Sequence, residues 1–184
     1  MDRRTFADRI SQGIILGGLL ASACLGGSVA AAAEPDPVLR GTGDLGIVVE
    51  RAAGRVQIID TSTRSRIGQV AGLGDLSHAS AVFSRDGRFA YVFGRDGGLS
   101  KIDLLAGRLA RRIVQAGNSI GGAISQDGRF VAAQNYEPGG VRVFDAVTLA
   151  PVADIPARYG NAGKTSKVVG LADAPGTGFV FALF

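Results

Sequence analysis

The chain has 184 residues, a formal net charge of +4 and a hydrophobic content of 46%, which is enough apolar material for the core of one ordinary domain. Its basic residues are scattered and form no run interleaved with aromatic residues, which excludes the usual footprint of a nucleic-acid-binding protein. A single histidine and a single cysteine exclude a zinc cluster and a disulfide framework.

The N-terminal segment 1–33 is predicted to be an export signal. Arg3 and Arg4 form a charged region of the twin-arginine type, an apolar stretch of small residues follows, and residues 31–33 offer a cleavage site. Cys24 lies in a sequence that resembles a lipoprotein cleavage box. We therefore expect export to the periplasm, and the sequence leaves open whether the mature protein is free or carries a lipid anchor on Cys24.

Residues 34–43 are predicted to be a linker, because Pro35 and Pro37 disfavour a helix at its start. The remaining residues, 44–184, are predicted to form one all-β domain. The 28 glycines of the chain agree with a fold that contains many turns.

The domain is organised around residues 74–103. Two Asp-Gly pairs, 86–87 and 96–97, flank the β-favouring run 89–93. Asp-Gly between such runs indicates hairpins, in which both central turn residues are expected at positive φ. In a strand over 89–93 the three aromatic residues share one face, and alanine and valine share the other.

This unit recurs along the chain. The hexapeptide 84–89, Ser-Arg-Asp-Gly-Arg-Phe, reappears at 125–130 as Ser-Gln-Asp-Gly-Arg-Phe, and residues 140–145 match the strand 98–103 in pattern. A period of roughly 40–45 residues with four short strands in each copy is typical of a β-propeller. We therefore predict an all-β fold, a partial β-propeller with about two complete and two partial four-stranded blades.

Several charged residues of the repeat are given structural roles. Asp60, Asp103 and Asp145 end equivalent strands and are expected to form turns. Arg85 and Arg88 lie in a predicted turn and are expected to be solvated.

His78 precedes the predicted inner strand of the second blade, where the connections between blades form one rim of a propeller channel. By residue type alone, both a structural histidine bonded to a turn aspartate and an iron ligand stay open. One imidazole can supply an axial bond to a haem iron, because the macrocycle supplies the other four ligands. Arg51, Arg95 and Lys167 lie at turns or strand entrances near the same rim and suit the carboxylates of a tetrapyrrole.

Several segments of the chain resemble the NirF family, exported proteins of heme d1 biosynthesis. This family is similar to the eight-bladed heme d1 domain of the periplasmic nitrite reductase of denitrifying bacteria. The segments are GLGDLSHAS, YVFGRDGG, QAGNSIGGAISQDG, NYEPGGV and SKVVGL. The resemblance runs from about Gly43 to Phe184, and the family proteins are longer, so residues 44–184 are expected to be the N-terminal part of a propeller that is truncated at its C-terminus.

The resemblance implies roles for single residues. His78 lies where the reductase domain has its proximal iron ligand and where NirF proteins have a functionally required histidine, so it is expected to be both iron ligand and catalytic residue. Arg51 and Arg95 match arginines that face the tetrapyrrole carboxylates. Weaker matches at rim positions add four cofactor-binding candidates: Asn118, Asn135, Tyr136 and Lys167.

The resemblance implies that the cofactor is heme d1 or an iron-containing precursor tetrapyrrole. It leaves open an enzyme that converts a siroheme-derived precursor in a late step, and a non-catalytic carrier that delivers heme d1 to nitrite reductase. A propeller scaffold for protein partners is the third alternative. The expected partners are other heme d1 biosynthesis proteins, nitrite reductase and, in a homodimer, a second copy of the chain.

Overall fold

The computed structural model describes residues 40–160, 163–176 and 179–183, with side chains up to residue 176. The predicted signal 1–33 lies outside these residues, and so does most of the predicted linker. The described residues belong to one compact unit, Val38–Phe184. They form β-strands and one short 3-10 helix, and no helix in this part of the chain has the length and apolarity to cross a membrane.

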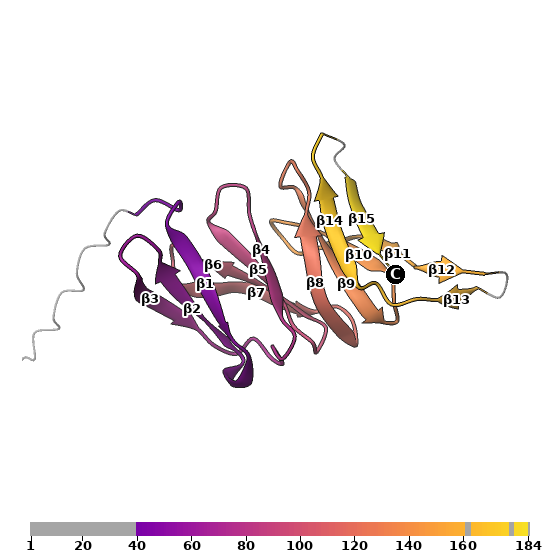
Figure 1. Ribbon diagram of the computed structural model, residues 1–184, viewed down its shortest axis with the longest axis horizontal. Helices are drawn as coiled ribbons and strands as arrows, with labels where there is room; N and C mark the ends of the chain where they lie inside the picture. Colours follow the sequence, from indigo (N-terminus) through magenta and orange to yellow (C-terminus); the bar gives the residue numbers. More distant parts are fainter. Residues whose placement is uncertain (1–39, 161–162, 177–178, 184) are drawn as a thin grey trace, which may run out of the picture. The chain divides into compact units, whose positions relative to one another are not determined.

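Four antiparallel sheets follow one another along the chain and lie side by side (Figure 1). The first sheet contains β1 (Leu45–Glu50), β2 (Arg55–Asp60) and β3 (Ser65–Val70), with the 3-10 helix η1 (Arg51–Ala53) between β1 and β2. The second contains β4 (Ser80–Phe83), β5 (Phe89–Phe93), β6 (Gly98–Asp103) and β7 (Arg108–Val114). The third contains β8 (Asn118–Ile124), β9 (Phe130–Glu137), β10 (Val141–Asp145) and β11 (Pro151–Ile155). The fourth contains β14 (Gly170–Ala174) and β15 (Phe179–Leu183).

Two four-stranded sheets flanked by a three-stranded and a two-stranded sheet confirm the predicted partial propeller with two complete and two partial blades. A small hairpin, β12 (Arg158–Tyr159) with β13 (Lys164–Thr165), lies in the connection from the third sheet to the fourth.

The first strands of consecutive sheets touch one another: β4 contacts β8, and β8 contacts β14. The strands of each four-stranded sheet then follow outward in chain order. The outermost strand is β7 in the second sheet and β11 in the third. This arrangement of sheets around a shared inner row of strands is the architecture of a β-propeller. It confirms the prediction that the strand after His78 is the innermost one of its blade.

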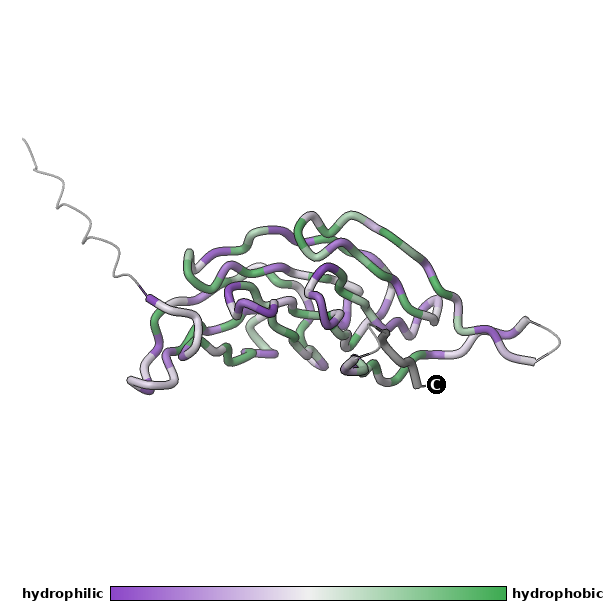
Figure 2. Tube along the Cα trace, turned by 90° about the horizontal axis from the view of Figure 1, so that it is seen from above, coloured by the Kyte–Doolittle hydropathy of each residue, from purple (hydrophilic) through white to green (hydrophobic). Residues whose placement is uncertain are grey.

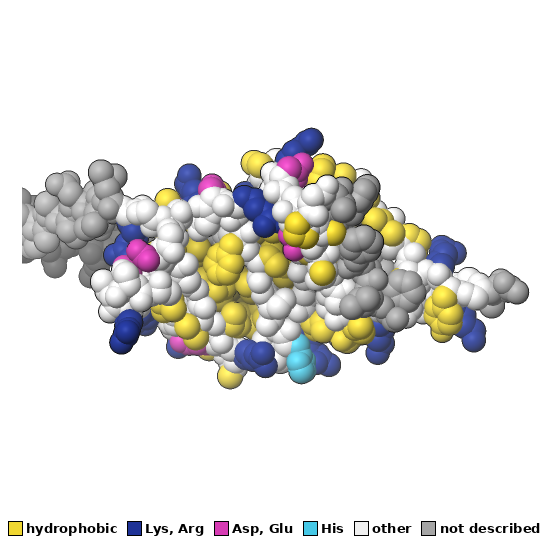
Figure 3. Space-filling view, turned by 45° about the horizontal axis from the view of Figure 1, so that its top comes forward, with side chains coloured by type: hydrophobic (Ala, Val, Ile, Leu, Met, Phe, Trp, Pro, Cys, Tyr) yellow, Lys and Arg dark blue, Asp and Glu magenta, His cyan; other side chains and the backbone are white. Residues whose placement is uncertain are grey.

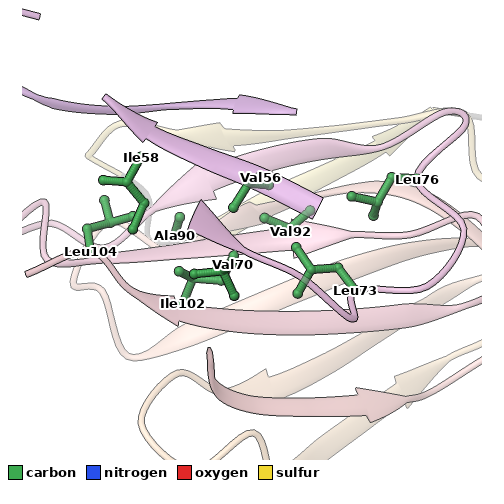
Figure 4. Close-up of a cluster of buried hydrophobic side chains, with 9 residues drawn as sticks. All are labelled: Val56, Ile58, Val70, Leu73, Leu76, Ala90, Val92, Ile102 and Leu104. Carbon is green, nitrogen blue, oxygen red and sulfur yellow. The ribbon is translucent and has the colours of Figure 1, made fainter. Parts of the chain in front are cut away.

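The alternation of side chains in β5 divides the core in two. Ala90 and Val92 face the first sheet, where they pack into the cluster drawn in Figure 4, whereas Tyr91 and Phe93 face the third sheet. Phe93 is fully buried. Burial of one such side chain contributes on the order of 1.5–3 kcal/mol, so the apolar faces of the sheets hold neighbouring blades together. The view from above shows hydrophobic and hydrophilic residues alternating along the strands (Figure 2).

The repeated Ser-x-Asp-Gly turn is built by the same hydrogen bonds in both copies. Ser84 Oγ donates to Asp86 Oδ1 at 2.5 Å and accepts from the N–H of Phe89 at 2.8 Å, and residues 125–130 repeat both bonds. Only the glycine has a positive φ, 70° at Gly87. The expectation of positive φ at both central residues is wrong, because the N–H of Gly87 bonds to the carbonyl of Ser84 and only the last turn position is left-handed.

Arg85 and Arg88 are exposed, as expected, but their guanidinium groups also bind other parts of the domain. The Arg85 guanidinium donates to the carbonyl of Ser125 at 2.9 Å and forms an ion pair with Asp173 at 3.0 Å, so it joins the second, third and fourth sheets. Arg88 pairs at 2.8 Å with Asp103, whose carboxylate is buried. The guanidinium group has enough donors to satisfy carbonyls and carboxylates together.

The three recurrent aspartates confirm their predicted role as turn formers. In each case Oδ1 accepts a hydrogen bond from the main-chain N–H three residues later. The distances are 3.0, 3.1 and 2.7 Å for Asp60, Asp103 and Asp145.

Candidate functional site

One rim of the sheets is built from two kinds of segment: the turn after β1, β5 or β9, and the connection that leads to the next sheet. The carbonyl of Gly54 accepts from the N–H of Leu73 at 2.9 Å, and the carbonyl of Gly97 accepts from the N–H of Gln115 at 2.9 Å. Gly97 has φ 76°, and a Cβ there would lie 1.8 Å from the carbonyl oxygen of Ala116. The turn and the connection therefore touch through their main chains, and only glycine fits.

The third sheet repeats this contact. Gly139 and Gly140 have φ values of 88° and 83°. Cβ atoms on them would lie 2.2 Å from the carbonyl oxygen of Ser166 and 2.4 Å from that of Ile155. The backbone therefore fixes the spacing of the rim segments that carry the predicted site residues.

His78 lies in the connection between the first and second sheets. The N–H of Ala79 donates to the carbonyl of Leu76 at 3.0 Å, and the Leu76 side chain is buried in the core (Figure 4). The core packing of Leu76 therefore holds this turn in place. The imidazole is exposed and makes no hydrogen bond to any residue that the structure describes. Figure 3 shows it in cyan at the surface, with basic side chains on both sides. Both ring nitrogens are therefore free to meet a ligand.

Arg95 is brought beside this turn by the main chain, because its N–H donates to the carbonyl of Asp75 at 2.8 Å. The Asp75 carboxylate accepts from the N–H of Ser77 at 2.9 Å. Hydrogen bonds from the main chain and the side chain of Ser77 chiefly lower the pKa of Asp75, and the nearby Arg95 and His78 contribute less. The structure thus places the imidazole and one guanidinium around a single carboxylate.

Arg51 begins η1, in the turn that contains Gly54, and so lies on the same rim. The side chains of Arg51 and Arg95 are exposed and have no hydrogen-bond or ion-pair partner among the described residues. Six other arginines among the described residues are paired with carboxylates: Arg40, Arg55, Arg85, Arg88, Arg112 and Arg142. The two rim arginines are thus available to an anionic ligand.

The two predicted asparagines differ in their surroundings. Asn118 begins β8, and its Oδ1 is buried without a hydrogen-bond partner in the described structure, so it can accept a bond from a ligand. Asn135 is buried, and its side-chain amide is already paired: Gln115 Nε2 donates to Asn135 Oδ1 at 2.8 Å, and Asn135 Nδ2 donates to Gln115 Oε1 at 3.1 Å. Asn118 is therefore the more suitable of the two for a ligand.

Tyr136 and Lys167 meet at the third rim turn. The Lys167 ammonium lies 5.3 Å from the centroid of the Tyr136 ring, a distance typical of a cation–π contact. Lys167 is exposed and Tyr136 is half-buried. This pair adds an aromatic surface and a third cation to the rim.

The donor set fits a ligand that brings most of its own metal coordination. Over the described residues, no group of three or more His, Cys, Asp or Glu side chains could hold a bare metal ion. One free imidazole suits the axial position of an iron tetrapyrrole, and exposed guanidinium groups suit its carboxylates.

Residues 40–184 match the Cytochrome D1 heme domain family. The chain belongs to this family. It is 63% identical over 155 residues to Protein NirF of Pseudomonas aeruginosa, covering 84% of this chain and 40% of that protein. It is 61% identical over 163 residues to Protein NirF of Stutzerimonas stutzeri, covering 88% of this chain and 41% of that protein. The chain thus spans about two fifths of the length of these relatives.

A solved structure has the same fold. Dihydro-heme d1 dehydrogenase NirN in complex with DHE matches with a TM-score of 0.72 and 30% identity, over 81% of this chain and 32% of that chain. Together with the family match, this confirms the resemblance inferred from the sequence segments and the partial propeller fold.

Two residues that shape the site were missed in the sequence. Asp75 lies between His78 and Arg95, and Gln115 occupies the amide of Asn135. The signal for Asp75 was present, because an aspartate two residues before a serine is a common Asx turn. Nothing in the sequence pairs Gln115 with Asn135, because the bond joins a connection to a strand of the next repeat.

Proposed function

We propose that this chain forms part of a periplasmic binding site for heme d1 or its siroheme-derived precursor and takes part in a late step of heme d1 maturation. The observation that carries the proposal is the position of His78, Arg95 and Arg51 on one rim, all exposed and all without a hydrogen-bond partner in the described structure. The high identity to NirF proteins and the likeness to a dehydrogenase solved with DHE support it.

Each residue has a task toward such a ligand. His78 would hold the iron of the tetrapyrrole through one of its ring nitrogens. Arg51 and Arg95 would donate paired hydrogen bonds to peripheral carboxylates. The buried Oδ1 of Asn118 would accept from a donor of the ligand, and Lys167 would add positive charge beside the Tyr136 ring.

An enzyme and a carrier would both use the rim residues to hold the tetrapyrrole. In a catalytic role, His78 would hold the iron or move a proton at one of its ring nitrogens. A carrier would use the same residues to hold the ligand and release it to nitrite reductase. We favour catalysis, because the exposed imidazole lies beside a carboxylate and a guanidinium rather than in a closed apolar cavity. A mass measurement of the precursor after incubation distinguishes the two roles.

The test is a titration of the intact protein with heme d1, followed by absorbance, for the wild type, His78→Ala and Arg108→Ala. Arg108 is a matched control, because it is exposed at the start of β7 and its side chain makes no hydrogen bond to a described residue. We expect saturable spectral shifts for the wild type and the control, and an altered spectrum with roughly tenfold weaker binding for His78→Ala. If none of the proteins binds heme d1, the tetrapyrrole site is wrong and the scaffold function takes its place.

A further inference from the structure

A groove of about 660 Å³ lies between the outer strands of the second and third sheets and adjoins the rim at Gln115. β7 forms one wall, and β10, β11 and the turn between them form the other. Its apolar lining is Ile113, Val114, Phe144, Leu149, Ala150, Pro151, Val152 and Ala153, and its polar lining is Arg111, Gln115, Arg142 and Asp154.

The groove has a buried apolar floor and an exposed apolar mouth. Phe144 and Leu149 are 3% and 1% exposed, whereas Val114 and Val152 are 63% and 53% exposed. Large apolar side chains with this exposure, next to one another along a groove, are typical of a surface that binds another protein.

One positive charge at the groove is not compensated. On the third-sheet wall, Arg142 is paired with Asp154 at 3.1 Å and also donates to the carbonyl of Gln115. On the opposite wall, Arg111 is exposed and has no hydrogen-bond or ion-pair partner in the described part of the chain. A carboxylate on the bound molecule would complement it. A single free guanidinium is too little for a nucleic-acid backbone, which needs several cations.

The main chain at the groove is open as well. β11 pairs with β10 alone in the described structure, and all five of its residues are exposed. An edge strand of this kind can accept one further strand through its unpaired N–H and C=O groups.

We propose that this groove docks an extended segment of a partner protein. An apolar side chain of the segment enters between Val114 and Val152, an acidic side chain pairs with Arg111, and the main chain adds to the free edge of β11. The groove lining includes none of the residues assigned to the tetrapyrrole, so the proposal does not depend on tetrapyrrole binding.

The test uses nuclear magnetic resonance of the isotope-labelled intact protein with two capped hexapeptides, one alternating Glu and Val and one alternating Lys and Val. We expect the Glu–Val peptide to shift amide signals of β7 and β11. Arg111→Glu should weaken this binding at least tenfold and create binding of the Lys–Val peptide. The matched control is Arg108→Glu, because Arg108 lies on β7 outside the groove lining and should leave binding unchanged.

The proposal is overturned if the Glu–Val peptide shifts no signals of β7 and β11, or if Arg111→Glu behaves like Arg108→Glu. It is also overturned if the same signals shift with protein concentration alone, because a second copy of the chain would then occupy the groove. Val152→Asp, which places a charge at the exposed mouth, should abolish binding of the Glu–Val peptide.

Discussion

The main-chain N–H of Arg95 donates to the carbonyl oxygen of Asp75 at 2.8 Å, so the turn with Arg95 and the turn with His78 are joined by the backbone. The backbone positions of His78 and Arg95 relative to one another therefore do not depend on how either side chain packs. The Asp75 carboxylate lies close enough to both for their charges to lower its pKa.

Asp75→Asn should strengthen the binding of an anionic tetrapyrrole. Asparagine still offers a side-chain oxygen to the N–H of Ser77, but it removes the negative charge beside His78 and Arg95. Interactions between exposed charges are weak, so we expect binding to tighten only about twofold to fivefold in an absorbance titration. Arg95→Gln should weaken it by a similar factor. If both variants weaken binding equally, the carboxylate itself positions the ligand-binding residues.

Gly97→Ala should destabilise the domain more than Gly107→Ala. Both glycines have positive φ, 76° and 62°, but a Cβ on Gly97 would lie 1.8 Å from the carbonyl oxygen of Ala116, whereas Gly107 has open space. Positive φ alone costs alanine about 1–2 kcal/mol, and overpacking against backbone adds about 1–3 kcal/mol. Urea denaturation of the two variants measures the difference. Equal midpoints would mean that the connection moves aside without cost.

Tyr91 should make the domain less stable at alkaline pH. Its hydroxyl donates to the carbonyl of Ala146 at 2.8 Å, and burial raises the pKa of Tyr91 to about 12. A tyrosine in the unfolded chain loses its proton at about pH 10. Above that pH the unfolded state therefore binds fewer protons than the folded state. Stability should therefore fall between about pH 10 and 12, by at most about 1.4 kcal/mol per pH unit.

The check is a comparison of urea midpoints from about pH 8 to 11 for the wild type and Tyr91→Phe, which should lack this part of the slope. Lys101, which donates to the same carbonyl, acts in the opposite direction because burial lowers its pKa, but it is present in both proteins. Parallel curves for the two proteins would show that Tyr91 ionises equally in both states.

Asn135→Ala should reduce stability rather than ligand affinity. It leaves the buried Gln115 amide without its partner, and an unsatisfied buried polar group costs about 1–3 kcal/mol. Gln115→Ala should cost a similar amount, and the double variant should cost less than the sum, because the pair is lost only once. Thermal unfolding gives the stability, and titration below the melting range gives the affinity. Unchanged stability with weaker binding would assign Asn135 to the ligand.

The sequence allowed the repeat, the sheets and the two faces of β5 to be predicted, because all of these depend on patterns within one copy of the repeat. The rim position of His78 and Arg95 followed from the same repeat. The contacts of Arg85 with Ser125 and Asp173 could not be foreseen, since they join residues of different copies that come together only when the blades stack. The pairing of Asn135 with Gln115 was hidden for the same reason.

Because of the main-chain contacts at Gly54, Gly97 and Gly140, the dimensions of the rim and its chemistry depend on different parts of the chain. Its dimensions are set by main chain packed on main chain, whereas its chemistry is set by exposed side chains such as His78, Arg51 and Arg95. Substitution of these side chains leaves the distances between their Cα atoms unchanged and costs little stability. Proteins built on this framework can therefore diverge in the ligands they prefer while the framework itself stays constant.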